Sequence, residues 1–314
     1  MMSPKSEPAG ERRSAWLLLL AAVAMSVWLV LHTKRRASAL PRVDLLSVVP
    51  SGPELLVTAD LASLDAATVR SLLRAGGDAL LGLQGQCGFE PLLGVKRVAL
   101  AVPFRANPEP GLADFALVAE TSLTQEAVLR CAESVIQKRG GKSVRSRLGR
   151  FTSVRDKGKP EGEVAIRDDG LFVLSGGQYF RDVIDAAGGT LSGDQPARLR
   201  AELHLALRRK FASSQLIVTL LPDATSLVPG VQALGLGVEV KRELELRGFV
   251  GCRSEEACSQ ARELALSMKN ELAHDPRVSG LSSVSIVQHQ QQLTIDGHLP
   301  RAELPELFAQ LLAL

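Results

Sequence analysis

The chain has 314 residues, of which 46% are hydrophobic, 23% charged and 4% aromatic, and its formal net charge is +3. This composition is typical of a globular protein and gives no overall electrostatic drive towards nucleic acid, so we expect no nucleic-acid partner. The length allows one large domain or two ordinary ones, and the few aromatic residues require a core built mainly from Leu, Val and Ala.

The first element is an apolar segment between basic clusters, "ERRSAWLLLLAAVAMSVWLVLHTKRR" (11–36). At about 1.5 Å per residue, 14–32 is just long enough to cross a hydrocarbon core about 30 Å thick. We therefore expect a cytoplasmic N-terminus at 1–13, a transmembrane helix at 14–32 and a linker at 33–53. A cleavable signal peptide is the alternative, because Ala37-Ser38-Ala39 has the form of a cleavage site. Lys and Arg are nearly balanced across the helix, so they do not orient it.

Residues 54–195 are expected to form a first α+β unit. Apolar runs and alternating patterns predict strands at 54–60, 95–103, 114–120, 151–156 and 163–176. The Asp169-Gly170 pair predicts a hairpin turn inside the last of them. A helix is predicted from Ser122, with Gln125 as its capping-box partner, to Gly140-Gly141. The short helix "QYFRDVIDAAGG" closes this half.

Residues 196–314 are expected to form a second α+β unit. A strand is predicted at 215–222, and "GVEVKRELELRGFV" (237–250) alternates apolar and charged residues, which indicates a half-buried strand or a hairpin folded near Lys241. A helix begins after Ser254, which is a suitable N-cap. "LSSVSIVQ" and "QLTIDGHLP" predict a hairpin around "HQQ", and "RAELPELFAQLLAL" predicts a terminal helix.

The order strand-helix-hairpin-helix-hairpin-helix can be traced in both halves. This similarity predicts two tandem copies of one unit, with a single irregular α+β domain as the alternative. Because the strands come mostly as hairpins, the expected fold class is α+β, with mainly antiparallel sheets and helices packed on one face.

Two patterns carry a family resemblance. "CGFEPLLGVKRVALAVP", followed by "DFALVAE" and a helix ending in "RGG", resembles an uncharacterised family of membrane-anchored proteins from myxobacteria and their relatives. A strand ending in Gly-Cys before an acidic-capped helix resembles such envelope proteins too. The resemblance covers most of residues 45–299. It implies a place in the cell envelope and implies no activity.

The four cysteines are candidates for two disulfides. Cys252 ends a predicted strand and Cys258 lies early in the next helix, so their side chains are expected to meet. Cys87 and Cys131 form the second candidate pair. On the chain-entropy model, closing these loops contributes about 2.4 and about 4 kcal/mol, respectively. The alternative is four buried thiols in a reducing cytoplasm. Disulfides require an oxidising compartment, so this reading favours a single-pass protein of the inner membrane with its bulk in the periplasm.

No sequence motif indicates catalysis, a cofactor or a metal. "RGGKS" (139–143) lacks the first glycine of a phosphate-binding loop and follows a predicted helix. His289 and His298 could approach each other in the last hairpin, but a third metal ligand is missing. We therefore expect a non-enzyme without cofactor or metal. The alternatives are an anchored hydrolase with a noncontiguous site, which would gather His289 and His298 with acidic residues in a polar pocket, and a carrier of an apolar ligand.

The strongest interaction signal is basic. Between Lys138 and Lys159 only Asp156 opposes nine Lys and Arg residues, which predicts a surface for an anionic lipid, a cell-wall polymer or an acidic envelope protein. A solvated strand face is the alternative. The sequence thus favours a membrane-anchored envelope protein that binds or scaffolds another envelope component. The candidate contacts on this surface are Arg145, Arg147, Arg150, Arg155, Lys157 and Lys159.

Overall fold

The computed structural model describes residues 44–49, 54–75, 85–90, 94–103, 114–158, 162–177, 179–188, 198–221, 229–272 and 276–303. The predicted N-terminus and transmembrane helix, 1–32, lie outside these residues, and no described helix is long and apolar enough to cross a membrane. The folded unit begins at Asp44, inside the stretch that the sequence assigns to a linker. There the 3-10 helix η1 (Leu45–Val48) buries Leu45 and Val48.

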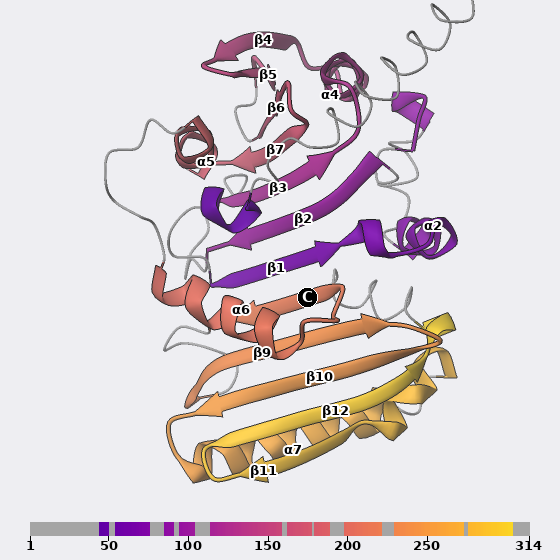
Figure 1. Ribbon diagram of the computed structural model, residues 1–314, viewed down its shortest axis with the longest axis vertical. Helices are drawn as coiled ribbons and strands as arrows, with labels where there is room; N and C mark the ends of the chain where they lie inside the picture. The colour runs from indigo at the N-terminus through magenta and orange to yellow at the C-terminus, as the bar shows by residue number, and fades with distance from the viewer. Residues whose placement is uncertain are drawn as a thin grey trace, which may run out of the picture. The chain divides into compact units, whose positions relative to one another are not determined.

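The fold class is α+β, as expected, and its centre is one large antiparallel sheet. Twelve strands follow the order β11-β12-β10-β9-β8-β1-β2-β3-β7-β6-β5-β4 (Figure 1). The strands are β1 (Leu55–Asp60), β2 (Val95–Val102), β3 (Phe115–Thr121), β4 (Ser143–Leu148), β5 (Phe151–Asp156), β6 (Glu163–Arg167), β7 (Leu171–Gly176), β8 (Leu216–Leu220), β9 (Val231–Val240), β10 (Glu243–Cys252), β11 (Ser285–His289) and β12 (Gln292–Pro300). The helices are α2 (Ala66–Ala75), α4 (Gln125–Lys138), α5 (Tyr179–Gly188), α6 (Arg198–Lys210) and α7 (Glu255–Leu272), with short 3-10 turns η2 (Leu61–Ser63), η4 (Pro276–Ser283) and η5 (Arg301–Glu303).

The first and second halves of the chain meet in the middle of the sheet. β1 pairs antiparallel with β8, so that Leu55 lies opposite Leu220 and Val57 opposite Val218. On one side of this junction β1, β2 and β3 form a meander, α4 follows, and the returning strand β7 pairs with β3. On the other side β8, β9 and β10 form a meander, α7 follows, and the returning strand β12 pairs with β10. A single sheet therefore replaces the separate sheets that the sequence suggested.

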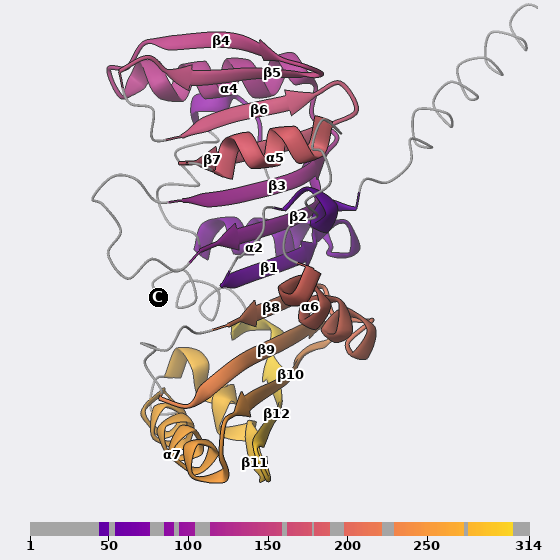
Figure 2. The same ribbon diagram turned by 90° about the vertical axis from the view of Figure 1, so that its left-hand side faces the viewer.

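Helices cover both faces of this sheet, which corrects the expectation of one covered face. In β10, Val250 packs with Cys258 and Ala261 of α7, whereas the next strand residue inward, Phe249, packs with Leu207 of α6. Since successive strand residues point to opposite sides, α6 and α7 lie on opposite faces, which we call the α6 face and the α7 face. The strand registers place Ile166, on which α4 packs, on the α7 face. The next residue, Arg167, therefore points to the α6 face, where it donates to the Ala187 carbonyl of α5. Figure 2 shows α5 in front of the sheet and α4 behind it.

The physical reason is that the central strands are apolar on both sides. β8 and β1 read "LIVTL" and "LLVTAD", and a strand of this kind has to be covered on both faces. The expectation rested on strands that come as hairpins, which can leave one face of a sheet to solvent, and it does not hold for these central strands. Helices therefore lie on both faces, although α4 and α7 pack on outer strands of the α7 face and the central strands stay half-buried there.

Most of the turns and helix caps predicted from the sequence are confirmed. The chain reverses at Lys241-Arg242 between β9 and β10, and at Asp169-Gly170, where Gly170 has φ +85°. The hydroxyl of Ser254 accepts from Ala257 N at 3.2 Å at the start of α7. The predicted start of α4 at Ser122 was wrong, because Thr124 is the N-cap of this helix. The Gln125 amide donates to Thr152 and to the Ile166 carbonyl instead of capping the helix.

Candidate functional site

All four cysteines form the two disulfides that were named as candidates from the sequence. Cys252, at the end of β10, is bonded to Cys258 in α7, and Cys87 is bonded to Cys131 in α4, so that no cysteine is free. Cys258 is fully buried against Val250 and Leu293. One disulfide connects α7 to the end of β10, and the other connects α4 to the segment around Cys87. The bonds therefore brace the helical layer on the α7 face.

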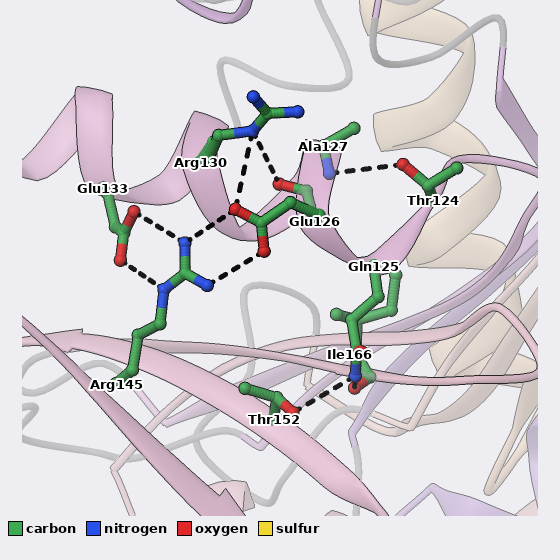
Figure 3. Close-up of polar contacts among 9 residues, drawn as sticks. All are labelled: Thr124, Gln125, Glu126, Ala127, Arg130, Glu133, Arg145, Thr152 and Ile166. Atoms are coloured by element: carbon green, nitrogen blue, oxygen red, sulfur yellow. Dashed lines mark hydrogen bonds and ion pairs between the residues drawn. The ribbon is translucent and has the colours of Figure 1, made fainter.

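Arg145 stands between two carboxylates of α4. Its guanidinium donates to Glu133 from Nε at 2.5 Å and from Nη2 at 2.9 Å, and to Glu126 from Nη1 at 2.9 Å and from Nη2 at 3.1 Å (Figure 3). These bonds, first from Glu133, raise the pKa of Arg145, and in return they lower the pKa of both carboxyl groups. Arg130 of the same helix also lies 3.5 Å from Glu126. Arg145 thus fastens the edge strand β4 to α4, and its charge is compensated within the protein.

The other basic residues of the predicted surface do not form one stripe. Arg147 lies opposite Thr152 on the α7 face, whereas Arg155 lies opposite Glu163 and so points to the α6 face. Arg150 sits in the turn between β4 and β5. Burial raises the pKa of Asp169, but Arg167 and, to a smaller extent, Arg150 lower it, and the net pKa shift is downward. Lys157 is exposed just beyond β5, and Lys159 lies outside the described residues. Among the described residues of the predicted surface, Arg147, Arg150, Arg155 and Lys157 are exposed, and Arg147 and Arg155 lie on opposite faces of the sheet.

The two histidines named for a catalytic alternative lie far apart. Both are on the α6 face, but His289 pairs with Gln292 while His298 lies six residues further along β12, opposite Glu245. Six strand residues span about 20 Å, so the hairpin does not bring the imidazoles together. Among the described residues, no group of three or more His, Cys, Asp or Glu side chains is placed to hold a metal ion.

A buried histidine that the sequence did not single out lies at the junction of the halves. His204 of α6 is fully buried, with Nε2 2.8 Å from the Thr58 hydroxyl in β1 and Nδ1 2.9 Å from the Thr219 hydroxyl in β8. The Thr219 hydroxyl also donates to the Leu56 carbonyl at 3.2 Å, so it accepts from Nδ1–H, and Nε2 accepts from Thr58. In this arrangement the imidazole is neutral, because Nε2 acts as an acceptor. Burial, and then the charge of Arg208, lower the pKa of His204 from 6.5 to about 4.

The α7 face of the central strands is entirely apolar and only half-buried. On this face α4 packs on β5 and β6, where Val128 and Leu129 meet Val154 and Ile166, and α7 packs on β10 and β11. In the strands between, the opposite face is closed: Leu56, Ala99, Ala101, Ile217 and Thr219 are buried. The half-buried residues of the α7 face, which we call the central apolar face, are Leu216, Val218 and Leu220 of β8, Leu55, Val57 and Ala59 of β1, and Val98, Leu100 and Val102 of β2.

Comparison with known proteins gives a fold relative and no family. No family model and no curated protein matches the chain. A crystal structure described as crystal form I of TP0453 is similar with a TM-score of 0.51 and 12% sequence identity, over 86% of this chain and 98% of that chain. This likeness extends over nearly all of that protein, and at this identity it concerns the fold alone.

Proposed function

We propose that this chain is a single-pass protein of the inner membrane whose α+β region lies in the periplasm and binds or scaffolds another envelope component without catalysis. The observation that supports this most is the pairing of all four cysteines in two disulfides, because such bonds persist in oxidising compartments. The apolar segment at 14–32 supplies the anchor, with 1–13 on the cytoplasmic side.

The location is tested by fusing a reporter that is active only in the periplasm to the C-terminus. We expect activity from the full chain, and activity from a cytoplasmic reporter at the same position would contradict the proposal. Alkylation of the denatured, unreduced protein with a maleimide reagent provides an independent check. We expect no labelled thiol before reduction and four after it.

An anionic envelope component is the partner that we propose for the β4–β5 end of the sheet. Arg147 and Arg150 are exposed there, and Arg145 has to stay intact because it holds α4. The double variant Arg147→Glu and Arg150→Glu should weaken retention on anionic vesicles or on purified cell wall, more strongly at low salt. Arg253→Glu, at an exposed position after β10, is the matched control. Equal retention of both variants and the wild type would argue against this surface.

The matching order of elements on the two sides of the β1–β8 junction supports a further proposal about organisation. We propose that 54–195 and 196–314 are tandem copies of one unit, each with a three-stranded meander, a helix and a returning strand beside the third. Two copies of a unit should open as two cooperative blocks in amide hydrogen exchange, and exchange in a single block would count against it.

A second candidate function, carriage of an apolar ligand, is favoured by the central apolar face. Aliphatic side chains from three neighbouring strands remain half-buried there, and apolar surface of that kind is typical of ligand sites. Val57→Phe with Val218→Phe, neighbours across the junction, should fill this face and reduce binding of a fluorescent fatty acid by about tenfold. Val287→Phe on the opposite face is the control, and a wild-type protein that binds no probe would contradict the idea.

A further inference from the structure

The two ends of the sheet differ in how they are protected against pairing with another strand. At one end β4 carries Arg145 and Arg147, and charged side chains of this kind discourage the addition of a further strand. At the other end β11 reads "SIVQH" and contains no Asp, Glu, Lys, Arg or Pro. Its register with β12 is regular over five pairs, without a bulge. β11 is short, but it lacks the other common protections of an edge strand.

The backbone of β11 presents a defined set of groups outward. A two-residue turn, Gln290-Gln291, joins β11 to β12, so the flanking pair His289–Gln292 exchanges backbone hydrogen bonds. By alternation, Val287 and Ser285 also direct their backbone groups towards β12. The N–H and C=O groups of Ile286 and Gln288 therefore point away from the sheet. The Gln288 side chain is held by Glu255 O and Ser259, which leaves its backbone presented at the edge.

An apolar side chain lies at the centre of this edge. Val287 is 45% exposed, one of three large hydrophobic residues exposed to this degree in the described part of the chain. Its side chain lies on the α6 face opposite Thr294 of β12, and Thr294 in turn lies opposite Phe249 of β10. An exposed valine in the middle of an uncharged edge strand is a typical site of strand addition.

We propose that β11 pairs antiparallel with β11 of a second copy of this chain, about a two-fold axis at Val287. The outward N–H and C=O groups of Ile286 then bond those of Gln288 of the partner subunit, and the two-fold axis repeats this pairing for Gln288 of the first copy. Every outward backbone group of Ile286 and Gln288 therefore has a partner. Val287 meets its own symmetry mate in a non-hydrogen-bonded pair, where side chains approach most closely. No charge meets a like charge, because β11 has none. The dimer joins two sheets into one continuous sheet.

A cysteine cross-link in the full chain, in its membrane, tests this arrangement. In the proposed pair the two Val287 Cα atoms lie about 4.5 Å apart, which a disulfide can bridge. Thr294 faces the same side one strand deeper, so its two Cα atoms lie about 14 Å apart, beyond the limit of about 7 Å. After mild oxidation we expect a reducible dimer from Val287→Cys and only monomer from Thr294→Cys. Monomer from both variants, or equal dimer from both, would overturn the proposal.

Sedimentation of the solubilised full chain gives a second measurement. The wild type should be a dimer, and Val287→Lys should weaken association roughly tenfold by placing two like charges on the axis. Arg147→Lys at the other end of the sheet should leave the association constant unchanged. A monomeric wild type, or a Val287→Lys variant that associates as strongly as the wild type, would contradict the β11 interface.

Discussion

Acidification should destabilise this protein through His204. The imidazole is fully buried, accepts from Thr58 at Nε2 and donates to Thr219 from Nδ1. A second ring proton would reverse the Thr58 bond and place a charge in the interior, which is costly. Burial first, and then Arg208, lower the pKa of His204 to about 4, whereas the unfolded chain takes up the proton near 6.5. The neutral ring therefore stabilises the folded state above about pH 6.5, and this stability is lost as the pH falls towards 4.

The magnitude follows from the two pKa values. A difference from 6.5 to about 4 corresponds to about 3 kcal/mol of stability between neutral pH and pH values below 4. Most of it, about 2 kcal/mol, should be lost between about pH 7 and pH 4.5. That is a large part of the 5–15 kcal/mol, roughly, by which domains are usually stable.

Urea unfolding at several pH values, followed by circular dichroism, measures this loss. His204→Gln keeps a donor and an acceptor but does not titrate, so its stability should fall about 2 kcal/mol less than that of the wild type over the same interval. His298→Gln, at an exposed position on β12, should follow the wild type. If His204→Gln and the wild type lose stability equally on acidification, the reasoning about a buried neutral imidazole is wrong.

Two further predictions concern the ion pairs of Arg167 and Arg145 and the two disulfides, all of which hold helices in place. Arg167 is buried and donates to Asp169 and to the Ala187 carbonyl in α5. Arg167→Met should lower the free energy of unfolding in urea by about 3–5 kcal/mol, because it leaves the Asp169 carboxylate without this partner. Arg145→Met, at a partly exposed clamp, should cost only about 1 kcal/mol, and less at high salt, so equal losses at the two sites would refute this comparison. Replacing Cys87 and Cys131 together by Ser should cost about 4 kcal/mol, and replacing Cys252 and Cys258 about 2.4 kcal/mol, measured by denaturant unfolding. The opposite order would show that loop closure does not set the contribution of these bonds.

Local signals in the sequence determined much of this fold. The alternation in 237–250 predicted a half-buried strand or a hairpin folded near Lys241, and the structure has the hairpin. Asp169-Gly170 marked a turn, and Ser254 marked the start of α7. The short spacing of Cys252 and Cys258 indicated a bond between the end of a strand and the next helix. Each signal involves residues close in the chain, whose geometry depends on backbone preferences and side-chain period more than on distant packing.

Tertiary structure decided what those signals meant. Within the run of basic residues, Arg145 binds Glu126 and Glu133 of α4 and so holds this helix to β4. His289 and His298, which the predicted hairpin could have brought closer together, lie far apart because of the register of β11 and β12. His204 bonds two threonines on strands from different halves. The order of strands and the faces of the central sheet depend on pairings between residues far apart in the chain. Composition and periodicity say which segments become strands, but the neighbour of each strand is selected only when the whole sheet forms.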